Sequence, residues 1–198
     1  MCYNHSRHTI EEVLGLDNVK RCRWCNPNNR LYVEYHDREW GVFNFDEGYL
    51  FEMLLLESFQ AGLSWECVLN KRESFRQAFD GFDPHKIACY DEHKTAELMS
   101  NPGIIRNRRK IEAAVNNSRV FLDIAREFGS FGSYLKSFTK GETLHECGNT
   151  TNPLSDAISK DLKKRGMKFV GSTIIYSYLQ AIGVIYSHDR DCYLYKGE

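Results

Sequence analysis

The chain has 198 residues and a formal net charge of −1, with 42% hydrophobic residues, 13% aromatic residues and four prolines. A chain of this length buries roughly 70% of its unfolded surface, and this composition excludes a disordered or fibrous protein. The balanced charge gives no support to a uniformly basic nucleic-acid-binding protein. Residues 106–110 (RNRRK) and 160–168 (KDLKKRGMK) nevertheless concentrate cations that could meet phosphates, although either cluster alone is more often a solvated helix face.

Hydropathy points away from membranes and from secretion. No segment reaches the ~20 consecutive apolar residues of a membrane-spanning helix. Residues 1–21 also lack the apolar core of a secretory signal. We therefore expect a cytoplasmic protein, associated with the nucleoid if its source is bacterial, with no membrane partner. The seven cysteines would then stay reduced, so they pack or bind metal rather than form a disulfide framework.

The pattern along the chain predicts an extension followed by one domain. Residues 1–20 form a polar N-terminal extension with a short helix expected at 10–16, and residues 21–198 form the single domain. Segment 31–44 mixes aromatic and charged residues too closely for a plain helix. From residue 47 onward the apolar period is helical.

The helical period allows most later elements to be placed. Asp83 and Pro84 mark a helix start, as N-cap and first helical residue. We predict helices over 47–63, 65–82, 84–91, 93–100, 108–129, 131–139, 154–166 and 172–185, with a loop at 141–153. No pair of strands joined by a hairpin turn is apparent. The sequence therefore predicts an all-α fold.

One carboxylate stands out within the helix predicted at 47–63. Glu57 follows Leu50 and Met53 by seven and four residues, so it lies on the apolar stripe that faces a core or a pocket. An unpaired carboxylate there would cost several kcal/mol or become neutral. Glu57 must therefore either pair with a buried cation or backbone group, or serve a binding site.

The connection between the last two predicted helices has the features of an anion site. Gly166 and Gly171 permit a tight turn, and the helix that opens at Ser172 or Thr173 exposes unpaired N–H groups. Lysines and an arginine surround this turn, at positions 163, 164, 165 and 168. The arrangement suits a DNA phosphate and needs no base reading. An ordinary helix–turn–helix connection with basic flanks explains the pattern equally well.

Cysteines and histidines near the two ends of the chain could form a metal site. Cys22, His36, His188 and Cys192 would give a closed Cys₂His₂ zinc site, which is structural because no coordination position is left open. In the chain-entropy model such a cross-link stabilises the fold by about 5 kcal/mol. The spacing of Cys22 and Cys25 leaves two alternatives open, a redox pair or a zinc site that uses Cys25 instead.

Several longer strings, taken together, carry a resemblance. They are RCRW, LYVEYHDREWGV, LFEMLLLESFQAGLSW, VLNKRESFRQAF, GIIRNRRKI and SDAISKDLKKRGMKFVGSTIIYSYLQAIG, and they run in order from about Arg21 to Cys192. The chain thereby resembles the 3-methyladenine DNA glycosylase I family, base-excision repair enzymes of the helix-hairpin-helix superfamily. The resemblance implies a helix-hairpin-helix glycosylase fold in which one structural Zn²⁺ joins the N- and C-terminal segments.

The resemblance also implies roles for particular residues. It assigns the zinc ligands as Cys22, His36, His188 and Cys192, with Cys25 as a bystander. A base pocket would be lined by Trp24, Tyr32, Tyr35, Trp40 and Trp65. Glu57 would lie at its floor as the catalytic residue, reading the base rather than acting as a nucleophile, with general-base activation of water as the competing role. DNA contacts would come from Gln60, Gly62, Leu63, Lys164, Gly166, Lys168, Gly171, Ser172 and Thr173.

The implied activity is hydrolytic excision of 3-methyladenine that has been flipped out of double-stranded alkylated DNA. The products would be the free base and an abasic site, without a lyase step, and the protein would act as a monomer. Two other classes remain open from the residues: a zinc-stabilised module that binds damaged DNA without turnover, and a redox protein that uses Cys22 and Cys25. Asp189 follows the hairpin by the interval typical of a superfamily aspartate, but its place between two ligands favours a loop residue.

Overall fold

The computed structural model describes residues 19–197, and within them the fold is almost entirely helical. The helices are α2 (Arg30–Arg38), α3 (Glu47–Gln60), α4 (Trp65–Leu69), α5 (Arg72–Ala78), the 3₁₀ helix η1 (Asp80–Phe82), α6 (Pro84–Ile87), α7 (Glu92–Ser100), α8 (Arg108–Phe128), α9 (Phe131–Thr139), α10 (Pro153–Lys164) and α11 (Ser172–Ala181). Two short strands complete it, β1 (Leu144–His145) and β2 (Ile185–Tyr186). The all-α prediction is confirmed. Of the expected extension, residues 1–18 lie outside the described residues, and so does the helix expected at 10–16.

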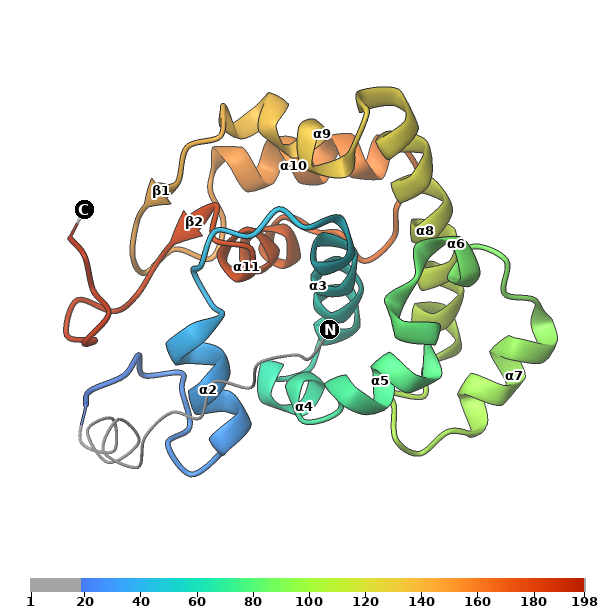
Figure 1. Ribbon diagram of the computed structural model, residues 1–198, viewed down its shortest axis with the longest axis horizontal. Helices are drawn as coiled ribbons and strands as arrows, with labels where there is room; N and C mark the ends of the chain where they lie inside the picture. Colours follow the sequence, from blue (N-terminus) through green and yellow to red (C-terminus); the bar gives the residue numbers. More distant parts are fainter. Residues whose placement is uncertain (1–18, 198) are drawn as a thin grey trace, which may run out of the picture.

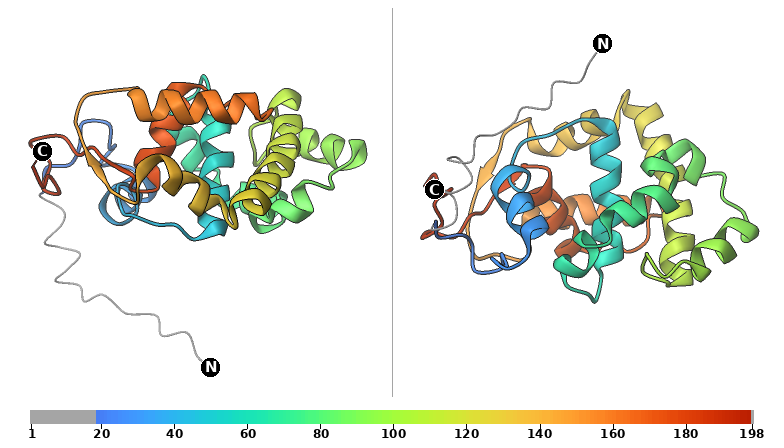
Figure 2. Two further views of the ribbon diagram at one scale, coloured as in Figure 1. Left: turned by 90° about the horizontal axis from the view of Figure 1, so that it is seen from above. Right: turned by 60° about the horizontal axis from the view of Figure 1, so that its bottom comes forward.

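Helix α3 runs through the centre of the molecule, with α11, α8 and α9 packed around it (Figures 1 and 2). Every residue from Leu50 to Phe59 is buried. Phe51 packs against Phe121 of α8 with ring centroids 5.0 Å apart, and Phe121 stacks on Phe131 of α9 at 4.3 Å. Because α3 has no solvent-exposed face in this stretch, its polar side chains must find partners inside the protein.

The segment 31–44 departs from its prediction, because its first half is the regular helix α2. The Asn29 side chain caps it by accepting from the Tyr32 N–H, and Tyr32, Tyr35 and His36 form its buried face. That face has helical spacing of three and four residues. The mixed chemistry that argued against a helix arises because these buried positions carry aromatic and imidazole side chains instead of aliphatic ones.

Several predicted helices are shorter than expected. The helix predicted over 47–63 ends at Gln60, and the one predicted over 84–91 ends at Ile87. The helix predicted over 65–82 is divided into α4, α5 and η1, with Asn70 closing α4 and a left-handed Gly81 (φ +70°) inside η1. The helix predicted over 172–185 ends at Ala181. Beyond it, β2 pairs in parallel with β1, which lies in the predicted loop 141–153. Two-residue strands carry too little alternation to be recognised from sequence.

Gly183 connects α11 to β2 at a place where two backbone segments touch. Its φ is +74°, and a Cβ there would lie 2.2 Å from the Phe43 nitrogen and 2.3 Å from the Val42 carbonyl carbon. The neighbouring Asn44 N–H donates to the Ile182 carbonyl at 3.1 Å, which holds the two segments together. Only glycine satisfies both the left-handed backbone and the close approach.

Within residues 19–197 no helix combines the length and the apolar character needed to cross a bilayer.

We expect Gly183→Ala to lower the free energy of unfolding by about 3 kcal/mol or more, because left-handed strain and overpacking add at this position. Gly129→Ala is the matched control, since Gly129 is also left-handed (φ +85°) but no atom lies within 4 Å of its added Cβ. It should cost about 1 kcal/mol. Urea unfolding measures both, and equal losses would show that the contact with residues 42–43 is unimportant.

Candidate active site and candidate metal centre

A cavity of about 360 Å³ opens beside the middle of the molecule, between α2, α3, α4 and α11. Its lining includes every residue assigned to the base pocket from the sequence, namely Trp24, Tyr32, Tyr35, Trp40 and Trp65, together with Glu57 and Gln60. These residues come from the segment before α2, from α2 and the turn after it, and from α3 and α4. The fold thus brings seven residues spread over positions 24–65 to one cavity.

The aromatic side chains form a continuous wall. Trp24 contacts Tyr32 at a centroid distance of 5.2 Å and meets Trp40 edge-on at 4.8 Å. Tyr35 lies 5.4 Å from Trp65 in a tilted arrangement. Burial raises the pKa of Tyr32 to about 12, and that of Tyr35 also lies above its ordinary value, so both phenols are neutral at pH 7. The wall suits a flat, electron-poor ring, which stacks on aromatic faces.

Glu57 differs from the other polar side chains in the buried part of α3. Glu52 is paired with Arg72 at 2.7 Å and with Arg76 at 2.5 Å, and the Ser58 hydroxyl donates to the Leu54 carbonyl at 2.8 Å. Glu57 is only 3% exposed, and its Oε2 has no hydrogen-bond partner among the described residues. Burial alone raises its pKa well above its ordinary value. The cavity therefore holds a carboxyl group that the fold itself does not use.

Two more polar atoms at the cavity are also unpaired. The Gln60 Oε1 and the Trp65 indole N–H are buried without a partner among residues 19–197. Glu57, Gln60 and Trp65 all line the cavity, so its lining residues carry two acceptors and one donor without partners. Buried polar atoms without partners are rare in folded proteins, and three around one cavity indicate a ligand that completes them.

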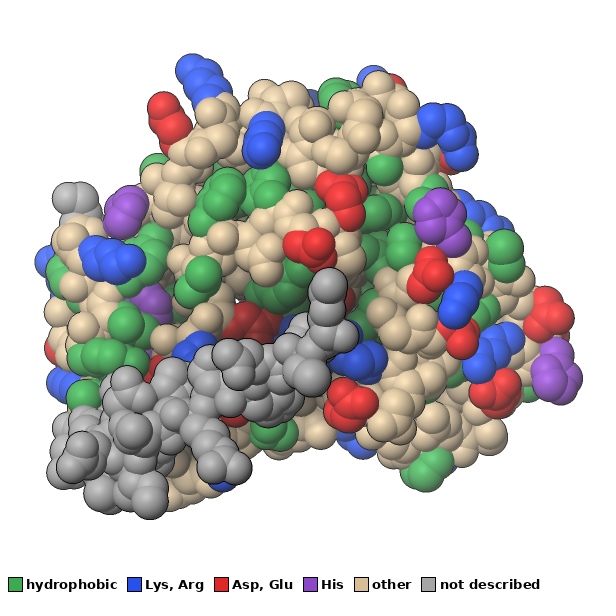
Figure 3. Space-filling view, in the orientation of Figure 1, with side chains coloured by type: hydrophobic (Ala, Val, Ile, Leu, Met, Phe, Trp, Pro, Cys, Tyr) green, Lys and Arg blue, Asp and Glu red, His purple; other side chains and the backbone are tan. Residues whose placement is uncertain are grey.

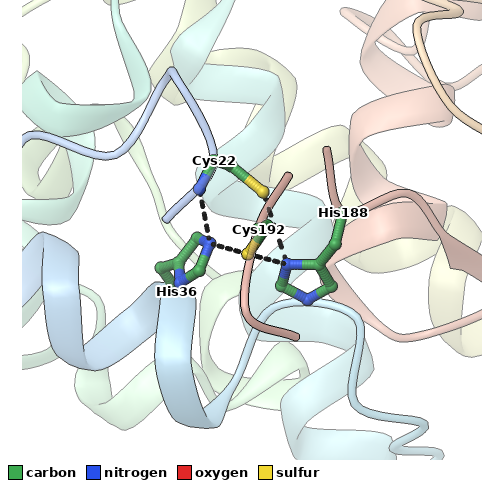
Figure 4. Close-up of side chains that lie close together, drawn as sticks. All are labelled: Cys22, His36, His188 and Cys192. Carbon is green, nitrogen blue, oxygen red and sulfur yellow. Dashed lines mark hydrogen bonds between the residues drawn. The ribbon is translucent and has the colours of Figure 1, made fainter. Parts of the chain in front are cut away.

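Cys22, His36, His188 and Cys192 converge on one point beside this cavity (Figure 4). The four ligand atoms lie within 4.8 Å of one another, and all four residues are buried. The Cys192 Sγ is 3.5 Å from both His36 Nε2 and His188 Nδ1, and the Cys22 Sγ is 3.4 Å from His188 Nδ1. Cys25 is not part of the cluster, since its thiol contacts the Tyr32 carbonyl at 3.8 Å.

The surroundings of the four residues fit a metal ion. The His36 Nδ1 donates to Asp37 at 2.8 Å, and this leaves Nε2 unprotonated. Nε2 accepts from the Cys22 backbone N–H at 3.2 Å and lies 3.5 Å from the Cys192 Sγ. Arg21 holds the Asp37 carboxylate at 2.7 Å. Burial lowers the pKa of both imidazoles, that of His188 to about 4, so both rings are neutral, the form that binds metals. The group could therefore hold a metal ion.

The cluster also supports the wall of the cavity. Trp40 meets His188 edge-on at 4.8 Å, and Trp24 contacts His36 at 5.2 Å. The cluster ties together segments that are distant in sequence, and Lys20 adds a second link through its carbonyl, which accepts from the Tyr193 N–H at 2.8 Å. Two indoles of the pocket thus pack directly on the candidate metal ligands.

The residues assigned to DNA contact form two separate surface segments. Gln60 is the last residue of α3, and Gly62 and Leu63 follow in the turn between α3 and α4, where Gly62 has φ +80° and Leu63 is 42% exposed. The others belong to the connection between α10 and α11. There Lys164, Lys168 and Thr173 are exposed, Gly166 has φ +100°, and Gly171 is the N-cap residue of α11 without a side-chain hydrogen bond.

Some polar groups of the α10–α11 connection and of the basic segment 106–110 are already paired within the fold. The Ser172 hydroxyl contacts Ser155 at 2.9 Å and also bonds Asp156. In the other basic cluster, Arg108 pairs with Glu92 at 2.8 Å, and Lys110 is buried. Cationic and acidic side chains alternate around α7 on the face shown in Figure 3. Within segment 106–110, Arg108 is therefore paired with an acid and Lys110 is removed from the surface, whereas Arg106 and Arg109 are exposed.

The rest of the cavity lining was not identified from the sequence. It consists of Gly148, Asn149, Ser177, Gln180, Ser187 and Asp189. Ser177 and Gln180 are one turn apart on α11, a pattern that looks like an ordinary helix face. The β1–β2 pairing brings residues 148–149 and 187–189 to the cavity, and no local pattern encodes it. Asp189 lines the cavity and accepts from the Arg23 backbone N–H at 2.8 Å.

Comparison with known proteins places the chain in a family. The model of the methyladenine glycosylase family matches residues 24–195. DNA-3-methyladenine glycosylase 1 of Escherichia coli K12 is 45% identical over 186 residues, covering 90% of this chain and 98% of the relative. DNA-3-methyladenine glycosylase of Haemophilus influenzae is 40% identical over 178 residues, covering 87% and 96%.

Solved structures agree with the sequence relatives. A crystal structure of 3-methyladenine DNA glycosylase I has a TM-score of 0.85 at 44% identity, covering 89% of this chain and 100% of that chain. A Staphylococcus aureus structure that concerns recognition of 3-methyladenine has a TM-score of 0.83 at 34% identity, covering 90% and 100%. The chain belongs to the methyladenine glycosylase family. This confirms the family and the enzyme class predicted from the sequence, the glycosylases that hydrolyse N-glycosyl bonds.

We expect Glu57→Gln to raise the free energy of unfolding at pH 7 by roughly 1–3 kcal/mol, because the amide removes an uncompensated buried carboxyl group. The folded protein binds this proton more tightly than the unfolded chain does. The gain should therefore grow as the pH rises above the ordinary value of 4.5 and disappear below it. Thermal unfolding across pH 4–8 measures it.

Glu52→Gln is the control for that measurement. Glu52 is equally buried on the same helix but is paired with Arg72 and Arg76, so its substitution should destabilise the protein. If both variants are destabilised alike at pH 7, Glu57 has a structural partner after all.

Proposed function

We propose that this protein excises 3-methyladenine from double-stranded alkylated DNA. It flips the damaged nucleotide into the aromatic cavity and hydrolyses the N-glycosidic bond, without a lyase step. The unpaired Glu57 carboxyl group inside an aromatic cavity carries the proposal. The cavity volume of about 360 Å³ lies within the usual range for small ligands. Enzymes that act on a base inside a duplex must first extrude it.

The chemistry follows from the charge of the substrate. A nucleotide methylated at adenine N3 is a cation, so its glycosidic bond is already weak. On cleavage the bonding electron pair leaves with the base, and the base becomes neutral. Water adds its hydroxyl to C1′ of the sugar and releases one proton to solvent. The protein therefore has less to do in activating the leaving group than in selecting and orienting it.

The cavity residues have matching roles. The indole and phenol rings stack on the cationic base, with cation–π attraction of about 0.5–2 kcal/mol per contact. Glu57 accepts hydrogen bonds from the amino edge of the base and complements its positive charge, which strengthens those bonds in a desolvated site. The cationic base also favours the ionised carboxylate, so binding opposes the effect of burial on its pKa.

The two surface segments would contact the DNA. Leu63, exposed at the turn beside the cavity, would fill the space that the flipped nucleotide leaves, together with Gln60 and Gly62. The α10–α11 connection would bind the backbone through the open N-terminus of α11 and through Lys164 and Lys168. The protein would act as a cytoplasmic monomer.

We further propose that the ion held by Cys22, His36, His188 and Cys192 is Zn²⁺. Two thiolates and two imidazoles are the donor set typical of tetrahedral structural zinc, and the four ligands leave no open position. A bound zinc ion would cross-link the two ends of the domain and take no part in the reaction.

The first experiment measures base release from methylated duplex DNA by chromatography, with wild type beside Glu57→Gln. We expect wild type to release free 3-methyladenine and the variant to release it at least about 10-fold more slowly, since a charge-assisted hydrogen bond is lost. A wild-type protein that carries metal and binds abasic duplex DNA but releases no base would instead be a damage-binding module.

The zinc proposal is tested by metal analysis of wild type, Cys22→Ala and Cys25→Ala. We expect one zinc per chain in wild type and in Cys25→Ala, and none in Cys22→Ala. Loss of the cross-link should lower the melting temperature by about 10–20 °C. If zinc is lost from Cys25→Ala but retained in Cys22→Ala, the ligand is Cys25 and not Cys22. If the protein carries no zinc and its activity depends on both thiols, a redox role is favoured.

A further inference from the structure

Lys110 is a buried lysine that contacts no carboxylate within the described residues. It lies in the first turn of α8 and is 7% exposed. Its ammonium group donates to the Phe59 carbonyl at 2.7 Å and to the Ala61 carbonyl at 2.6 Å. These carbonyls are at the C-terminal end of α3, where helical N–H donors have run out and a cation is favourable. The two carbonyls flank Gln60, so Lys110 holds the chain on both sides of this cavity residue.

The same face of α8 also holds the second surface segment. Asn117 is seven residues beyond Lys110, which places both on one side of the helix about 10 Å apart. The Asn117 amide donates to the Lys168 carbonyl at 2.8 Å and accepts from the Lys168 N–H at 2.8 Å. The neighbouring Asn116 donates to the Gly166 carbonyl at 2.9 Å. Three hydrogen bonds from one turn of α8 therefore fix the α10–α11 connection.

Lys110 also lies close to the α10–α11 connection itself. The Lys110 ammonium lies 6.0 Å from the centre of the Phe169 ring, within the connection that Asn117 holds. Phe169 has φ +54°, a left-handed backbone that is uncommon for a bulky residue and that the flanking hydrogen bonds maintain. The turn after α3 and the α10–α11 connection thus meet at Lys110.

We infer that Lys110 is a positioning residue that sets the Gln60–Leu63 turn relative to the α10–α11 connection, with α8 as the rigid spacer between them. The inference rests on the proposed function, in which both segments contact one duplex. A segment that inserts into the duplex and a segment that grips the backbone must keep a fixed separation to act on the same nucleotide. Lys110 touches neither base nor phosphate in this role.

The test is Lys110→Met, which keeps the length of the side chain and removes its donors. We expect about 10-fold weaker binding to a duplex oligonucleotide that carries a tetrahydrofuran abasic-site analogue. The affinity for free 3-methyladenine, followed by tryptophan fluorescence, should stay within about 2-fold of wild type, since Lys110 does not line the cavity and contacts neither Glu57 nor the aromatic wall. The binding stoichiometry for the free base also reports the folded fraction.

Salt dependence separates this role from a phosphate contact. Loss of one phosphate contact lowers the slope of log affinity against log salt by about 1. Because Lys110 is buried under carbonyls, Lys110→Met should weaken duplex binding without changing that slope. Arg109→Met is the matched control, since Arg109 is the exposed neighbouring cation. Any weakening that it causes should come with a reduced slope.

Each outcome decides the inference. Weaker duplex binding with unchanged slope and unchanged base affinity supports it. Unchanged duplex binding, a reduced slope, or parallel loss of duplex and base binding overturns it. If Lys110→Met does not fold, Asn117→Ala is judged by the same three measurements. A wild-type protein that binds neither the base nor the abasic duplex would overturn the proposed function instead, before either variant is compared.

Discussion

The structure depends on the complete burial of most of one helix, α3. In the stretch from Leu50 to Phe59, α3 has no face toward water, so each polar group on it needs an internal partner. Glu52 has two arginines, and Ser58 has a backbone carbonyl. The C-terminal carbonyls have Lys110. Glu57 alone among these side chains is left with an unsatisfied oxygen, and Glu57 is also the one of them that lines the cavity. The same helix thus carries the buried polar pairs that stabilise the fold and the unpaired carboxyl group of the cavity.

The cavity depends on distant parts of the chain. Its aromatic wall comes from residues 24–65, and its polar side comes from residues 148–149 and 177–189. The Cys₂His₂ cluster lies where these regions meet, with Trp24 and Trp40 packed on its imidazoles. A metal ion there would act on the pocket through packing, by holding the indoles in place, even though it is closed to substrate.

Sequence reasoning recovered the features that local pattern or a specific motif encodes. Helical periodicity placed α3 and α8, and the motif match selected the cavity aromatics, Glu57 and the four candidate ligands. Prediction from the sequence failed where tertiary contacts override local signals. Helix α2 was missed because its buried face is aromatic. Strands β1 and β2 were missed because two residues carry no period. Lys110 was grouped with surface cations because burial under carbonyls leaves no mark in the sequence.

The wide spacing of the candidate ligands has a consequence for synthesis of the protein. Cys22 and His188 are 166 residues apart. At ordinary elongation rates the ribosome needs on the order of 10–30 s to translate the intervening chain. Until the end of that time the wall formed by residues 24–65 lacks part of the remaining cavity lining and the complete cluster. The cavity lining and the cluster therefore cannot be complete before the C-terminal segment has been translated.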